Sequence, residues 1–222
     1  MEKFRSSWSV PGAFGTGIDV LADGDLLMAG RLVGERRVIS DSAVHRFTPD
    51  GQRVRAYFVP PEPVQFGESS MNAMKAIVVD STIIGLQHTT NVAVLHDLSS
   101  GAERADSLGG SFYRPLAWTL EPPSPPDAVI QEWFRDQIMA WWLRDLDEGV
   151  YAAGFRVWLD SLDDWRTRWV FATPKTGPFV ESELTDAHPA FIHDGRLYSV
   201  RIRPDGRTEL IVGEAPPLPD RE

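Results

Sequence analysis

The sequence contains no cysteine, which excludes disulfide bonds, thiolate-ligated metal sites and catalysis by a cysteine nucleophile. It is also short of basic residues, since 22 Lys and Arg stand against 32 Asp and Glu and give a formal net charge of -10 at pH 7. Nucleic acids and anionic membrane surfaces are bound through clustered Lys and Arg, so we expect neither as a partner.

Long apolar runs are missing as well. No stretch approaches the roughly 18 uninterrupted apolar residues of a transmembrane helix, so we expect no insertion into a membrane. Residues 1–10 contain no apolar signal-peptide segment, which predicts a cytoplasmic protein if the chain is complete. By contrast, 17 Pro, 18 Gly and 8 Trp are present, and this composition is typical of short strands separated by many turns.

Four segments repeat one pattern, in which an apolar run, a tight turn and a second apolar run follow one another. They span residues 18–30, 76–85, 141–154 and 190–200. Asp23-Gly24 and Asp194-Gly195 predict two-residue hairpin turns, because Asp and Gly tolerate a positive φ. Asp80-Ser81 and Glu148-Gly149 are looser forms of the same turn. The turns begin 57, 68 and 46 residues apart, which are the steps of a four-stranded propeller blade with insertions.

Each repeat continues into further strands that carry more charge. The expected strands span 43–48 and 53–59, then 91–96 and 103–107, then 168–173 and 179–184, and last 208–212 alone. Residues 4–10 have the pattern of an outer strand that would complete the last repeat. The sequence therefore predicts an all-β fold, a β-propeller of about four antiparallel blades. Two arrangements of these blades fit the sequence, a closed four-blade ring and an open part of a longer propeller. The alternative to a propeller fold is an antiparallel β-sandwich.

We expect residues 1–214 to form a single domain, followed by a Pro-rich disordered tail over 215–222. One interruption is helical. Residues 121–126 are a Pro-rich extended segment, and Asp127 then occupies the N-cap position of a short helix over 128–137. Val129, Ile130, Trp133 and Phe134 would form its apolar side, and the helix would act either as a packing plug or as a lid.

Three motifs resemble the blades of six-bladed propellers of the TolB-like and NHL-repeat kind. They are the turns at 47–52 (Phe-Thr-Pro-Asp-Gly-Gln) and 203–207 (Arg-Pro-Asp-Gly-Arg), and the hairpin that begins at Ile18. The resemblance implies six blades, where this chain holds about four, and so implies a C-terminal part of a longer propeller. Because such bacterial propellers are often exported, it also implies a periplasmic or extracellular location in that case.

Propeller geometry predicts where a ligand would bind. The loops that enter the first strand of each blade, and the loops between its second and third strands, emerge on one face, here called the loop face. Exposed Trp beside acidic residues can stack on sugar rings or anchor a protein partner. The candidate ligand-binding residues are Arg36, Arg37, His88, Trp158 and Trp165. The alternative, packing between blades, is what strand alternation predicts for Trp169.

A second set of residues carries metal-ligand chemistry. Asp, Asn and His gathered around the central channel resemble the metal site of gluconolactonase-like propellers. The candidate ligands here are Asp19, Asn72, Asp186 and His188, which suit one divalent cation such as calcium. In the alternative, the two aspartates accept hydrogen bonds from backbone amides at strand starts, and His188 lies in a turn before Pro189. No other cofactor is expected.

Two functions follow from these patterns. The sequence has no phosphate-binding loop with Lys, no Gly-x-Ser-x-Gly and no His-Glu-x-x-His. It therefore favours a non-enzymatic binding or scaffold module that uses the loop face to bind a protein, a glycan or another small molecule. The alternative is a metal-dependent hydrolase or lactonase with its site at the mouth of the central channel.

Overall fold

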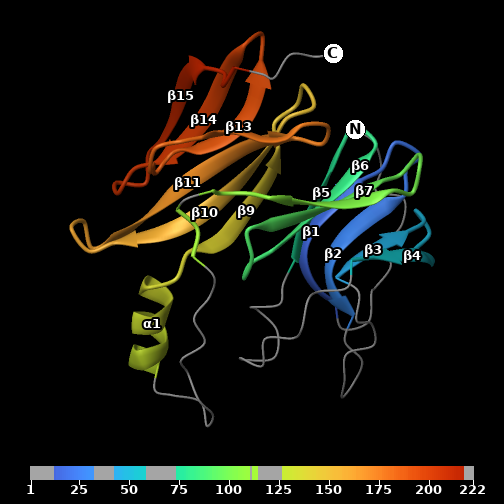
Figure 1. The fold of residues 1–222 in the computed structure, drawn as a ribbon, viewed down its shortest axis with the longest axis horizontal. Coiled ribbons are helices and arrows are strands. Elements are labelled where there is room, and N and C mark those ends of the chain that lie inside the picture. The colour runs from blue at the N-terminus through green and yellow to red at the C-terminus, as the bar shows by residue number, and fades with distance from the viewer. Residues whose placement is uncertain (1–12, 33–42, 59–73, 111, 115–126, 218–222) are drawn as a thin grey trace.

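The computed structural model describes residues 13–32, 43–58, 74–110, 112–114 and 127–217, which form four antiparallel sheets and one short helix (Figure 1). Sheet one contains β1 (Ala13–Val20), β2 (Leu26–Leu32), β3 (Val44–Phe47) and β4 (Arg53–Tyr57). Sheet two contains β5 (Met74–Val79), β6 (Thr82–Gln87), β7 (Val92–Asp97) and β8 (Glu103–Ser107). Sheet three contains β9 (Met139–Asp145), β10 (Tyr151–Leu159), β11 (Asp164–Thr173) and β12 (Gly177–Glu181), and sheet four contains β13 (His188–His193), β14 (Arg196–Ile202) and β15 (Thr208–Glu214).

In every sheet, each strand pairs with the next strand along the chain, as in a propeller blade. This confirms the predicted all-β fold with blade-like repeats. The two expected turn motifs do not occupy the same place in their blades, however. The turn at 47–52 joins the third and fourth strands of sheet one, whereas the turn at 203–207 joins the second and third strands of sheet four. These motifs therefore mark tight turns, and they do not identify a particular position in a blade.

Neighbouring sheets pack face to face in chain order. One apolar cluster lies between sheets one and two around Ile83, a second between sheets two and three around Phe155, and a third between sheets three and four around Trp169. The first strands β1, β5, β9 and β13 lie against one another in that order. Within the described residues, sheet four does not pack against sheet one, so the four sheets form an open arc. The strand expected over 4–10 lies outside the described residues.

Two of the four hairpin turns are the short loops expected, and two are wider, including the turn at Glu148-Gly149, where the Leu146 N–H donates a hydrogen bond of 2.9 Å to the Val150 carbonyl. Asp194 and Gly195 have φ of 50° and 69°, and Asp80 has φ of 53°, as short hairpin loops require. The turn at Asp23-Gly24 is longer than the two residues predicted. Leu21 and Asp25 close it by a hydrogen bond of 2.8 Å between the Leu21 N–H and the Asp25 carbonyl. In this wider loop only Gly24, at φ 88°, has a positive φ.

Helix α1 (Asp127–Arg135) confirms the predicted helix and leads into β9. Trp133 is buried as expected, whereas Val129, expected on the apolar side, is exposed. No helix in the described ranges is long and apolar enough to cross a membrane.

Candidate functional site

The predicted ligand-binding residues that the structure describes all lie on the loop face. His88 is in the loop between β6 and β7, and Trp158 and Trp165 lie at the end of the β10–β11 hairpin. Arg36 and Arg37 lie outside the described residues. Sequence reasoning placed the two tryptophans in a loop. The structure places them in paired strands, because the hairpin extends to Leu159 and Asp164 before it turns.

Trp158 and Trp165 form a pair across this hairpin. They are directly opposite each other in the β10–β11 register, and their ring centroids are 5.2 Å apart in an edge-to-face arrangement. The Trp158 indole N–H donates a hydrogen bond of 2.9 Å to Asp160. Both side chains are half-buried, so each one keeps part of its ring accessible to a ligand.

Two arginines lie against this tryptophan pair. The Cζ atom of Arg135, in the last turn of α1, is 4.4 Å from the Trp158 ring centroid. The Cζ atom of Arg156 is 4.4 Å from the Trp165 centroid and 5.2 Å from that of Trp141 on β9. Cation–π contacts of this kind hold the aromatic rings in place before any ligand arrives.

His88 extends the same row toward sheet two. Its ring stacks on Trp141 with 5.4 Å between centroids and 25° between planes. Its Nε2 atom is buried and has no hydrogen-bond partner among the described residues. Burial, and secondarily the charge of Lys75 on β5, lowers the pKa of His88 to about 4. His88 is therefore a neutral ring at neutral pH. The contacts so far form one aromatic–cation row, made of His88, Trp141, Arg156, Trp165, Trp158 and Arg135.

A pocket of about 310 Å³ opens at the α1 end of this row. Its walls come from the end of α1, the loop between α1 and β9, the end of β10 with Asp160 beyond it, and the segment around Phe112 and Arg114. The lining residues are Phe112, Arg114, Arg135, Asp136, Gln137, Ile138, Val157, Trp158 and Asp160. Of these residues, only Trp158 was predicted as a ligand contact. Arg156 could have been found from the sequence, because period-2 alternation puts it on the same face of β10 as Trp158. Arg135 could not, because a helix brings it there.

Of the predicted metal ligands that the structure describes, Asp19 is not brought together with Asp186 and His188. Asp19 lies at the end of β1 rather than at its start, because β1 already begins at Ala13. Its carboxylate accepts hydrogen bonds of 2.8 Å from the backbone amides of Val20 and of Val78 on β5. Asp19 thus links sheets one and two at the hairpin-turn end of the strands, opposite the loop face. Asn72 lies outside the described residues.

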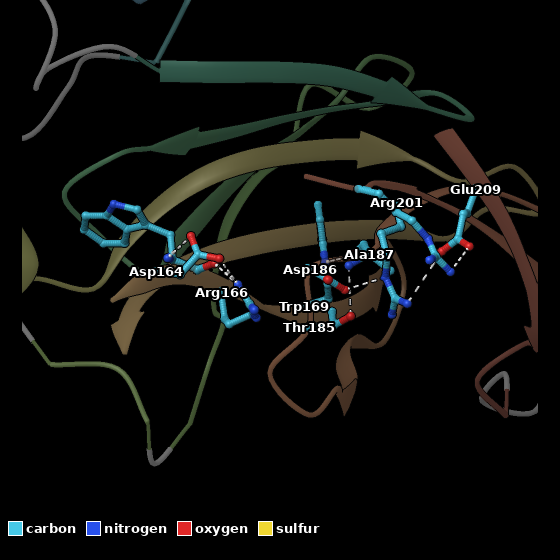
Figure 2. A network of polar contacts seen from close by, with 10 residues as sticks. Asp164, Arg166, Trp169, Thr185, Asp186, Ala187, Arg201 and Glu209 are labelled. Carbon is cyan, nitrogen blue, oxygen red and sulfur yellow. Dashed lines mark hydrogen bonds and ion pairs between the residues drawn. The ribbon is translucent and has the colours of Figure 1, made fainter. Parts of the chain in front are cut away.

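The other two predicted ligands lie before and at the start of β13, and each has its own structural role. Asp186 accepts a hydrogen bond of 2.6 Å from Arg201, which also lies 3.9 Å from Glu209 (Figure 2). His188 packs against the rings of Trp142 and Trp169 at 4.8 and 5.7 Å. Across the described ranges, no group of three or more His, Asp or Glu side chains could hold a metal ion. The metal site, and the hydrolase that would use it, stay predictions.

Trp169 is buried between sheets three and four, as strand alternation predicted. Its indole N–H donates a hydrogen bond of 3.0 Å to the Ala187 carbonyl (Figure 2). This bond joins β11 to the loop that leads into β13, so it positions the chain from which Asp186 and His188 project.

The two ends of the sheets differ in charge. At the hairpin-turn end, burial raises the pKa of Asp145, and the nearby carboxylates of Asp147, Asp19 and Asp80 raise it further. The loop face carries the arginines of the aromatic–cation row and Lys75 together with the carboxylates of Asp136, Asp160 and Asp164. An anion would therefore be repelled at the first end.

No protein-family model and no curated protein matches this sequence.

Proposed function

We propose that this protein is a non-catalytic binding module that holds a protein, glycan or other small-molecule ligand on its loop face. The observation that carries the proposal is the aromatic–cation row, which ends beside a pocket of about 310 Å³. Half-buried tryptophans present large, rigid surfaces at a low cost in conformational entropy. Here the contacts of Arg135 and Arg156 preorganise those surfaces.

A ligand panel tests this proposal. Glycans and peptides are titrated into the protein while tryptophan emission and the heat of binding are recorded. A ligand that binds the wild type should lose affinity by about tenfold or more in the double variant Trp158→Ala/Trp165→Ala, as expected of aromatic anchors at a binding site. Phe191→Ala is the matched control, because Phe191 is an exposed aromatic residue on sheet four, away from the row. A panel without any binding, or a double variant with wild-type affinity, would contradict the proposal.

We also propose that the four sheets are blades of a propeller of the TolB-like or NHL-repeat kind, which holds six. The open arc supports this assignment, as do the exposed apolar side chains on its two terminal sheets. Ile18 and Val20 of sheet one are 73% and 60% exposed, and Ile202 and Leu210 of sheet four are 70% and 63% exposed. In a longer propeller, neighbouring blades would cover such side chains.

Light scattering and thermal unfolding on one sample test this second assignment. Open terminal sheets should associate, so the mass should exceed 24.8 kDa. A monomer near 24.8 kDa with one cooperative transition would instead indicate a closed four-blade ring.

A further inference from the structure

Strand β15 is an open sheet edge. Within the described residues, sheets one, two and three each contain four strands, whereas sheet four contains three, and β15 lies at its outer end (Figure 1). No strand in the described part of the chain pairs with the far side of β15. An unpaired edge presents a row of free N–H and C=O groups, to which another strand can bind.

The outer strands of the other three sheets carry features that oppose pairing with a further strand, and β15 lacks them. β4 contains two arginines, β8 has the sequence Glu-Arg-Ala-Asp-Ser, and β12 contains Pro178, and each of these strands has only five residues. β15 has seven residues, with Leu210, Ile211 and Val212 at its centre and no Lys, Arg or Pro. A long apolar edge without such residues is a site of strand pairing.

The β14–β15 register identifies the backbone groups that remain free. The Arg203 N–H donates a hydrogen bond of 2.8 Å to the Arg207 carbonyl, and the Ala215 N–H donates one of 3.0 Å to the Gly195 carbonyl, so both ends of this ladder are hydrogen-bonded pairs. In an antiparallel ladder, such pairs alternate with pairs that exchange no hydrogen bond. Every second residue of β15 therefore directs its N–H and C=O away from β14, and these residues are Thr208, Leu210, Val212 and Glu214.

These four edge residues are complementary to a second copy of themselves. When two β15 strands pair antiparallel about Ile211, Leu210 lies opposite Val212 of the second copy and Thr208 lies opposite Glu214, so all four residues exchange hydrogen bonds. Glu209 then lies opposite Gly213, and no glutamate faces another glutamate. Leu210 and Val212 are 63% and 47% exposed, and this pairing brings them into contact across the edge.

A second copy suits this edge better than residues 4–10 of the same chain do. A strand over 4–10 would have to continue into β1, and only residues 11 and 12 stand between them. In the described residues, the shortest link from the fourth strand of one sheet to the first strand of the next is 182–187. Because an extended residue spans at most about 3.6 Å, two residues cover much less distance than that link.

We propose that this protein dimerises by pairing β15 of one copy with β15 of another, antiparallel and centred on Ile211. The pairing joins two three-stranded sheets into one sheet of six strands. Two identical antiparallel strands are related by a two-fold axis, so the interface is self-complementary and closed. The inference goes beyond the proposed ligand binding, because β15 contributes no residue to the aromatic–cation row or to the pocket.

Light scattering over a range of protein concentrations gives the mass and the dissociation constant of the dimer. We expect the wild type to reach twice 24.8 kDa. Val212→Pro should raise the dissociation constant by about tenfold or more, because proline removes one edge N–H from each copy. The pairing of β15 with β14 should persist, since the Val212 N–H points away from β14. Thermal unfolding of the variant verifies that its fold is intact.

The absence of cysteine allows a second test, which reports the register and does not depend on that variant. Ile211→Cys places the two thiols opposite each other in a pair without hydrogen bonds, where Cα atoms are about 4.5 Å apart, within the range of a disulfide. Mild oxidation should convert most of this variant into a covalent dimer. Val54→Cys is the matched control, because Val54 is a 55% exposed side chain on the outer strand of sheet one, and it should form little covalent dimer.

The outcomes decide both the dimer and its register. A monomeric wild type would overturn the proposal, and if deletion of residues 1–10 then produced a dimer, residues 4–10 would be the strand that occupies the edge. A dimer in which Ile211→Cys forms no more disulfide than Val54→Cys would use another surface, which also overturns the proposal. The ligand titrations are read separately, so either result leaves the binding function of the loop face to its own test.

Discussion

Lowering the pH should destabilise this protein through His88, which is neutral when folded and protonated when unfolded. The ring is buried against Trp141 and beside Lys75, and its pKa is about 4 in the folded protein against an ordinary value of 6.5. Between these two values the unfolded chain binds the additional proton. The contribution of His88 to stability is therefore fully present above about pH 6.5 and is lost progressively as the pH falls toward 4.

The magnitude follows from the difference between the two pKa values. The whole effect is about 3 kcal/mol, and about 2 kcal/mol of it should appear between about pH 7 and about pH 5. His188 contributes in the same direction, because burial and Arg144 lower its pKa, whereas the raised pKa of Asp145 acts in the opposite direction. The quantity to measure is therefore the difference between the wild type and a variant that lacks only the His88 titration.

His88→Phe is that variant, since phenylalanine can stack on Trp141 but binds no proton. Urea unfolding of both proteins, followed by circular dichroism at about pH 7, 6 and 5, yields the free energy of unfolding at each pH. We expect the wild type to lose about 2 kcal/mol more than His88→Phe over this range. His193→Phe, at an exposed histidine of sheet four, is the matched control for replacing a histidine by phenylalanine. Equal losses in the wild type and in His88→Phe would refute the reasoning.

Three further predictions concern stability, each measured by urea unfolding at neutral pH. Gly154→Ala should lower the free energy of unfolding by about 1–3 kcal/mol, because a Cβ at this position would lie 2.7 Å from the Trp169 ring. Gly213→Ala is the control and should have little effect, because no atom lies within 4 Å of its Cβ. Equal effects of the two substitutions would contradict this prediction. Trp169→Phe should cost about 1–3 kcal/mol, because it leaves the Ala187 carbonyl without its donor, and a neutral result would be inconsistent with that bond. Asp186→Asn should change the free energy of unfolding by no more than about 1 kcal/mol, because the ion pair of Asp186 with Arg201 is partly exposed to solvent. A larger loss would mean that this ion pair is shielded from solvent.

Much of the architecture could be predicted because it depends on short-range patterns. The repeated pattern of an apolar run, a tight turn and a second apolar run predicted all four hairpins, and Asp127 after a Pro-rich segment predicted α1. Pairing across a hairpin is equally local. Trp158 and Trp165 are therefore neighbours because they belong to one hairpin, which the sequence predicted, although the hairpin is longer than predicted.

The site depended on contacts between segments far apart in the chain. A strand that starts several residues earlier than expected moves Asp19 from the loop face to the opposite end, and no local pattern marks that start. Lys75, His88 and Trp141 come from two different sheets, and Arg135 reaches Trp158 from the helix. The sequence by itself determined which segments form strands and approximately where they turn, because steric and hydrogen-bonding preferences act between near neighbours. Only the tertiary structure decided which side chains face one another, because the packing of one sheet on the next depends on the shapes of both.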